Sequence, residues 1–92
     1  MPNLQAGLPG EDLITQGLRD LEQGAETIES LLVSMSAPQL RALGLVVAAP
    51  FDEPELRLYR RLATQHGAAA HSQYNALVRR IVSYQRAAAC AR

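Results

Sequence analysis

The sequence predicts an all-α fold, a small bundle of four main helices and one short helix in which neighbouring helices run antiparallel. Three observations predict this class. Of the 92 residues 48% are hydrophobic, and 15 Ala and 14 Leu supply most of them; both residue types lose little on entering a helix. Apolar residues recur at helical spacing in several segments. Gly or Pro separates these segments at short intervals, as expected of short connections between helices.

Length and charge limit how the chain is organised. Ninety-two residues fit one domain, which we place at residues 11–92 after an irregular lead-in over residues 1–10. Nine Arg balance nine acidic residues, so no overall field favours a polyanion or a membrane surface. A single Cys excludes an internal disulfide.

The first two helices are predicted over residues 11–23 and 25–35. On the first, Gly17 shares a side with apolar residues and would let another helix approach closely; these residues are Leu13, Ile14, Leu18 and Leu21. The second carries an apolar stripe with the i, i+3, i+4, i+7 spacing of a helix, formed by Ile28, Leu31, Leu32 and Met35. Both helices therefore present one side to a core.

Two capping patterns predict where the next helices begin. The segment Ser36-Ala37-Pro38-Gln39 matches a capping box with Pro in the first turn and predicts a short helix over residues 37–43. Residues 45–51 are apolar and lack caps, so we expect a packed connector, with a short strand over 45–47 as the alternative. In Asp52-Glu53-Pro54-Glu55 the Asp52 side chain is expected to cap a helix that runs to about His66.

The last two helices are predicted to be amphipathic. The apolar face of the fourth carries Leu56, Tyr59, Leu62 and Ala63, and its opposite face carries Arg57, Arg60 and Arg61. The fifth, over residues 69–89, is the longest. Its broad apolar side holds Tyr74, Leu77, Val78, Ile81, Tyr84 and Ala88, opposite Ser72, Asn75, Arg79, Ser83 and Arg86. We expect nearly complete burial of Leu18, Leu31, Leu62, Leu77 and Ile81.

The sequence contains no motif of a known catalytic class, and we expect a protein that is not an enzyme. It has no glycine-rich phosphate loop, no His-Glu-x-x-His and no paired Cys. The one distinctive polar cluster consists of His66, His71, Ser72 and Asn75, with His66 on the apolar side of its helix. Two His fall short of the three or four protein ligands of a zinc site. We therefore expect these groups to cap helix ends and predict no metal and no cofactor.

The uneven distribution of charge is compatible with nucleic-acid binding. Residues 1–50 hold six acids and two Arg, net −4, and residues 51–92 hold three acids and seven Arg, net +4. A candidate basic patch consists of Arg57, Arg60, Arg61, Arg79 and Arg86. In the alternative interpretation these side chains are solvated and pair with acids of the first two helices. The absence of Lys reflects either bidentate anion contacts or a GC-rich genome.

Association with protein is the function that the sequence favours. The apolar side of the fifth helix covers nearly half its circumference, which is more than short neighbouring helices need to cover. The candidate interaction surface consists of Tyr74, Tyr84 and Ala88, with Tyr84 as the first exposed candidate. Alternatively, the connector covers this side within the monomer.

The predicted function is thus a small interaction or regulatory module of a bacterial cytoplasm that binds a partner or a second copy. A DNA-binding regulator that uses the Arg faces of the last two helices is the alternative. We expect no membrane partner, because the longest apolar stretch, residues 45–51, is too short to cross a bilayer. The lead-in also lacks the basic residues of a secretory signal.

Overall fold

The computed structural model of the chain describes residues 8–91, with side chains over residues 8–90. In that range it contains helices and no strand. The helices are α1 (Glu11–Glu22), α2 (Ile28–Met35), α3 (Ala37–Ala42), α4 (Pro54–His66) and α5 (Ala70–Ala91), with a 3₁₀ turn at Gly67–Ala69. The predicted all-α class is confirmed, and the expected connector contains no strand.

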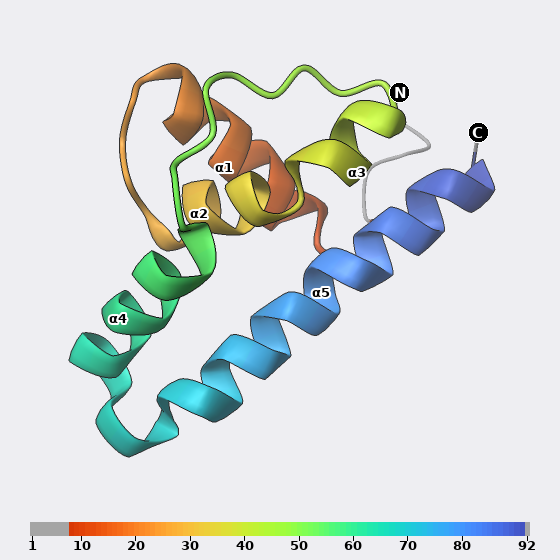
Figure 1. Cartoon of the computed structure of the whole chain (residues 1–92). Helices are drawn as coiled ribbons and strands as arrows, with labels where there is room; N and C mark the ends of the chain where they lie inside the picture. The colour runs from red at the N-terminus through yellow and green to blue at the C-terminus, as the bar shows by residue number, and fades with distance from the viewer. Residues whose placement is uncertain (1–7, 92) are drawn as a thin grey trace.

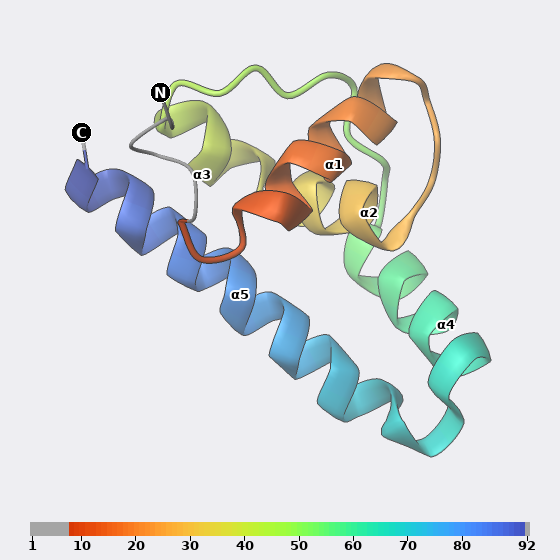
Figure 2. The same cartoon turned by 180° about the vertical axis from the view of Figure 1, so that it is seen from behind.

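The long helix α5 packs against α1, α2 and α4 (Figures 1 and 2). Helix α4 packs along the first half of α5 and runs in the opposite direction, so the two form the α4–α5 hairpin. Helices α1 and α2 pack mainly on each other, and both also contact α5. The segment that leads into α1 crosses the second half of α5 (Figure 2). The resulting molecule is elongated, with principal extents of 41 × 25 × 23 Å.

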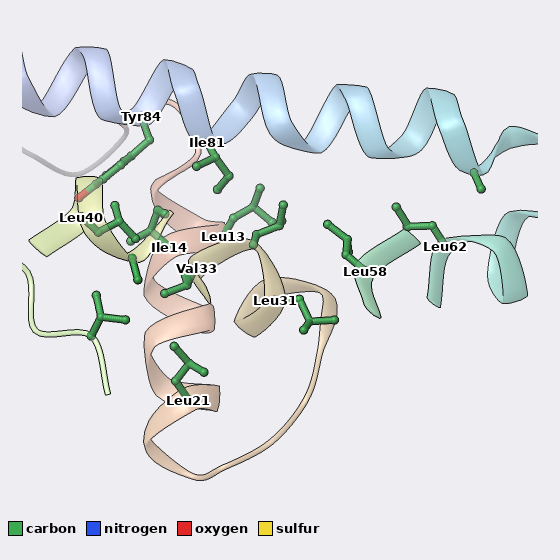
Figure 3. Packing of buried hydrophobic residues seen from close by; sticks show 14 residues of the cluster. Leu13, Ile14, Leu21, Leu31, Val33, Leu40, Leu58, Leu62, Ile81 and Tyr84 are labelled. Carbon is green, nitrogen blue, oxygen red and sulfur yellow. The ribbon is translucent and has the colours of Figure 1, made fainter. Parts of the chain in front are cut away.

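One apolar cluster forms the core and receives side chains from every α-helix and from the connector (Figure 3). Its most deeply buried members include Ile14, Leu31, Leu32, Leu40, Leu58 and Leu62. Burial is confirmed for Leu31, Leu62 and Ile81, but Leu18 and Leu77 are only partly buried. The prediction of nearly complete burial is therefore wrong for these two residues, which lie at the edge of the cluster.

A hydrogen-bonded turn joins α1 to α2 and sets the start of α2. The Thr27 hydroxyl accepts a hydrogen bond from the Ser30 backbone N–H (3.0 Å), and the Ser30 hydroxyl oxygen accepts one from the Thr27 N–H (2.7 Å). Thr27 also donates to the buried carboxylate of Asp20 (2.6 Å). Because this capping box places the N-cap at Thr27, α2 begins at Ile28 rather than at Ala25 as predicted.

The predicted close approach at Gly17 is confirmed. A Cβ atom on Gly17 would overlap the Glu29 carbonyl oxygen and the Val33 side chain. Helix α2 therefore lies against α1 at a separation that only glycine permits. The cost of Gly17 to the helical propensity of α1 is offset by this contact.

The two predicted side-chain caps are wrong. Ser36 is the N-cap of α3, but its ψ angle of 8° is not the extended conformation in which a serine caps, and its side chain makes no cap bond. The N-cap of α4 is Glu53, in the left-handed region (φ 48°), so the exposed Asp52 lies one residue too early to cap. Pro54 occupies the first turn of α4 as expected.

The buried side of α4 also differs from the prediction. Leu58 and Leu62, one turn apart, are buried, whereas Leu56 and Tyr59 are 46% and 40% exposed. The predicted apolar face is rotated around α4 relative to the buried side, because it omits Leu58. Beyond α3, the connector is held by hydrogen bonds from Phe51 N to Ser34 Oγ (3.1 Å) and from the Arg41 guanidinium to the Val47 carbonyl (2.9 Å).

Candidate interaction surface

The polar cluster of histidines lies at the surface around the α4–α5 turn. His66, His71 and Ser72 are exposed and Asn75 is partly buried. His66 follows the buried Leu58 and Leu62 at four-residue spacing, on the predicted side of α4, but it is exposed at the end of the helix. The one short polar contact within the cluster joins Asn75 Nδ2 to His71 Nε2 at 3.2 Å, one turn apart on α5. Over residues 8–90, no three His, Cys, Asp or Glu side chains converge as a metal site.

Zinc is expected to leave the melting temperature of the protein within about two degrees of its metal-free value, because a ligand stabilises a fold only by binding it. Thermal unfolding followed by circular dichroism, with and without zinc, measures this shift. His66→Ala serves as the comparison. A rise of about ten degrees that His66→Ala removed would show a metal site and contradict the prediction.

The arginines of α4 lie around an open hollow of about 540 Å³, lined by Arg57, Arg60, Arg61, Glu26, Glu53, Leu56, Thr64 and Gln65. We call it the Arg hollow. Glu26, just before α2, accepts hydrogen bonds from Arg57 Nη1 at 2.8 Å and from Arg61 Nε at 3.1 Å. Two of the three guanidinium groups that line the Arg hollow, those of Arg57 and Arg61, are therefore paired within the chain.

Replacing Glu26 with Gln is expected to lower the free energy of unfolding by up to about 1 kcal/mol at neutral pH. Hydrogen bonds from Arg57 and then Arg61 hold the pKa of Glu26 below its ordinary value of 4.5. Its stabilising contribution is present above that value and is lost as the pH falls through the lower pKa of the folded state. Urea unfolding at several pH values should therefore show that the free energies of unfolding of Glu26→Gln and the wild type become more similar below about pH 4.5.

The exposed Glu22 provides the control for this prediction, because its side chain has no ion-pair partner among residues 8–90. Glu22→Gln should leave stability nearly unchanged at every pH. A Glu26→Gln variant that behaved in the same way would show that the paired arginines contribute nothing to the fold.

The structure does not gather the predicted basic patch into one surface. Arg79 and Arg86 are exposed, as expected for the polar side of α5, but neither lines the Arg hollow. Arg80 instead pairs with Asp12 of α1 at 2.8 Å. The expected pairing of these arginines with acids from the first half of the chain is confirmed at Arg57 and Arg61, and Arg80, which the predicted patch does not include, is paired in the same way. Arg60, Arg79 and Arg86 have no acidic partner within residues 8–90.

Tyr84 belongs to the core and not to an exposed surface, which corrects the prediction that it is the first exposed candidate. It is 8% exposed. The Cβ of Tyr84 lies near Gly10, in the segment that crosses α5. Burial raises the pKa of the Tyr84 phenol, and the negative charge of Glu11 makes a smaller contribution in the same direction. Ala88 is partly buried against the same core. Of the predicted interaction residues, only Tyr74 lies beside an exposed aromatic side chain.

A series of partly buried and exposed apolar residues runs along one side of α5 and continues onto Tyr59 of α4. The Tyr59 ring of α4 lies 5.9 Å from the Tyr74 ring of α5 and 6.5 Å from His71. Val78 and Val82 continue from Tyr74 at four-residue spacing, and Val82 is 37% exposed. We call Tyr59, Tyr74, Val78 and Val82 the hairpin face.

The hairpin face continues into a small apolar recess against α2. The recess, of about 50 Å³, lies beside Val78 and Val82 and is otherwise lined by Leu32, Met35, Ser36, Ile81 and Gln85. At the other end of the face, the hydroxyl groups of Tyr59 and Tyr74 make no hydrogen bond to any described residue. A tyrosine at an interface uses both an apolar ring and a polar hydroxyl, and both are available here.

The interaction surface predicted from the sequence omits three members of this face, Tyr59, Val78 and Val82. Tyr59 was assigned to the core side of its helix, and Val82 was assigned to neither side of α5. For Val78 and Val82, the sequence signal is their four-residue spacing from Tyr74. At that spacing each residue lies farther around α5 from the core-facing Ile81 than the one before it. The last residues of such a series therefore lie outside the core.

Comparison with known proteins identifies no relative: no protein-family model matches the chain, and neither curated proteins nor solved structures gave a significant match. No helix within residues 8–91 is both long and apolar enough to cross a membrane.

Proposed function

We propose that this chain is a small protein-association module without enzymatic activity, and that it binds through the hairpin face. The observation that carries the proposal is the pair of adjacent tyrosines on α4 and α5, whose hydroxyls have no hydrogen-bond partner among residues 8–90, continued by the partly buried Val78 and the exposed Val82. Tyrosines are enriched at protein interfaces and are frequent among residues that dominate binding energy. The proposal retains a bacterial cytoplasm as the setting and a regulatory or scaffolding role.

Photo-crosslinking in the native host tests which surface binds. A p-benzoylphenylalanine residue in place of Tyr59 keeps an aromatic ring beside Tyr74, at one end of the hairpin face. The matched control carries the same probe in place of the exposed Thr64, on the same helix but in the Arg hollow. We expect a discrete crosslinked product from the probe at residue 59 and none from residue 64. The reverse pattern would overturn the assignment of the surface.

DNA binding through the arginines of α4 and α5 is the alternative function, and the structure favours it less. Glu26 pairs with two of the five arginines of the predicted patch and offsets one of their two charges, and Arg79 and Arg86 lie outside the hollow that holds the other three. We expect affinity for duplex DNA no tighter than about 10⁻⁵ M at physiological salt. A tighter complex, steeply dependent on salt and lost in Arg79→Gln, would make DNA binding the better proposal.

A further inference from the structure

The hairpin face has borders of opposite charge. On the α4 side lies Glu55, whose carboxylate is close enough to Tyr74 to add to the effect of burial in raising the pKa of that phenol. On the outer side of α5 lie Arg79 and Arg86. All three side chains are exposed, and none has an ion-pair partner within residues 8–90. The face therefore has an apolar series, with the polar His71 and Gln85 beside it, an acidic border on one side and a basic border on the other.

Helix geometry shows that the two borders lie on opposite sides of the face. Each residue turns a helix by about 100°, so Arg79 and Arg86 lie about 160° and 140° around α5 from the buried Ile81. Tyr74, Val78 and Val82 lie between about 20° and 100° on the same scale. Helix α4 contacts α5 through Tyr59, which lies against Tyr74, the member of this series nearest Ile81, and Glu55 lies one turn before Tyr59 on α4. The apolar series thus separates the acidic border from the basic border.

We propose that a second copy of this chain covers the hairpin face, related to the first by a two-fold axis that lies in the interface and runs along α5. The inference rests on the proposed function and names the partner. A two-fold interface must be complementary to itself. Rotation about an axis along α5 exchanges the two borders, so the acidic border of each copy meets the basic border of the other. The dimer then contains the pair Glu55–Arg79 twice.

The other two-fold arrangement is disfavoured by charge. An axis that crosses α5 at a right angle within the interface keeps each border on its own side. Arg79 and Arg86 of one copy would then lie beside the same two arginines of the second, and like charges across an interface oppose binding. The self-complementary pattern is therefore specific for one orientation as well as for one partner.

Charge reversal in the full-length chain tests the dimer by sedimentation equilibrium at low ionic strength. The wild type is expected to dimerise. Glu55→Arg and Arg79→Glu should each raise the dissociation constant at least about tenfold, because each reversal creates two like-charged contacts per dimer. The double variant Glu55→Arg/Arg79→Glu restores both pairs with their signs exchanged and should return the constant to within about threefold of wild type.

The exposed Arg60, on α4 but in the Arg hollow, is the control, and Arg60→Glu should leave dimerisation unchanged. All substituted positions are exposed, and circular dichroism melts verify folding. A dimer unaffected by either single reversal, or not restored in the double variant, would overturn the inference. A monomeric wild type would also overturn it, yet the proposed function would stand if the probe at residue 59 then crosslinked to a different protein. Failure of both experiments would remove both proposals.

Discussion

Replacing Leu58 with alanine is expected to lower the free energy of unfolding by about 2–5 kcal/mol, the range for deletion of a fully buried leucine side chain. Leu58 is fully buried and points from α4 into the space between α4 and α5 (Figure 3). Helix α4 also packs on α2, so the cavity left by the substitution would lie where the α4–α5 hairpin joins the rest of the molecule. Urea denaturation followed by circular dichroism measures the loss.

Leu56 provides the matched control, because it is the same residue type on the same helix two positions earlier. It is exposed and lines the Arg hollow. Leu56→Ala should change stability by no more than about 0.5 kcal/mol, as expected of a surface substitution. Equal effects at the two positions would show that the buried side of α4 is wrongly assigned, and a larger effect at Leu56 would favour the face predicted from the sequence.

Substituting Gly17 with alanine is expected to destabilise the protein by up to about 2 kcal/mol, against the trend of intrinsic propensity. In an isolated helix the change would be favourable by about 1 kcal/mol. Here the added methyl group would overlap the Glu29 backbone and the Val33 side chain. Backbone atoms within a helix cannot rotate away, so α1 and α2 would have to separate, and forced overpacking typically costs about 1–3 kcal/mol. Thermal and urea unfolding measure the sum.

Gly44→Ala separates the effect of contact from that of backbone strain. Gly44 has a φ of 96° and open space where a Cβ would be, so alanine there adds strain without overlap and should cost about 1–2 kcal/mol. Gly17 lies within regular helix and carries no such strain. A stabilised Gly17→Ala variant would contradict the close contact between α1 and α2.

The helices and their order could be predicted from the sequence because apolar spacing and Gly or Pro breaks are local properties. The caps were harder. Thr27 caps α2 through bonds to Ser30 and Asp20, and the Asp20 contact depends on how the turn folds back on α1. At α4, a left-handed Glu53 displaced the expected Asp52 cap by one residue, and no sequence pattern marks that conformation for a glutamate.

Much of the candidate interaction surface could not be predicted, because burial on α5 depends on distant segments. Tyr84 is covered where the segment around Gly10 crosses α5, a contact between opposite ends of the sequence that periodicity cannot reveal. Tyr59 was placed in the core because a helical wheel orders residues around a helix but does not say which side meets its neighbours. Tyr74 belongs both to the surface predicted from the sequence and to the hairpin face, since it lies at the edge of the apolar side.

The most direct test of the central claim, that a second copy of this chain covers the hairpin face, is a dilution series of amide nuclear magnetic resonance spectra on the wild-type chain. The account predicts concentration-dependent shifts for Tyr59, Tyr74, Val78 and Val82, with Thr64 and Gln65 of the Arg hollow unchanged. Fixed resonances on the hairpin face, or shifts centred on the Arg hollow, would contradict it.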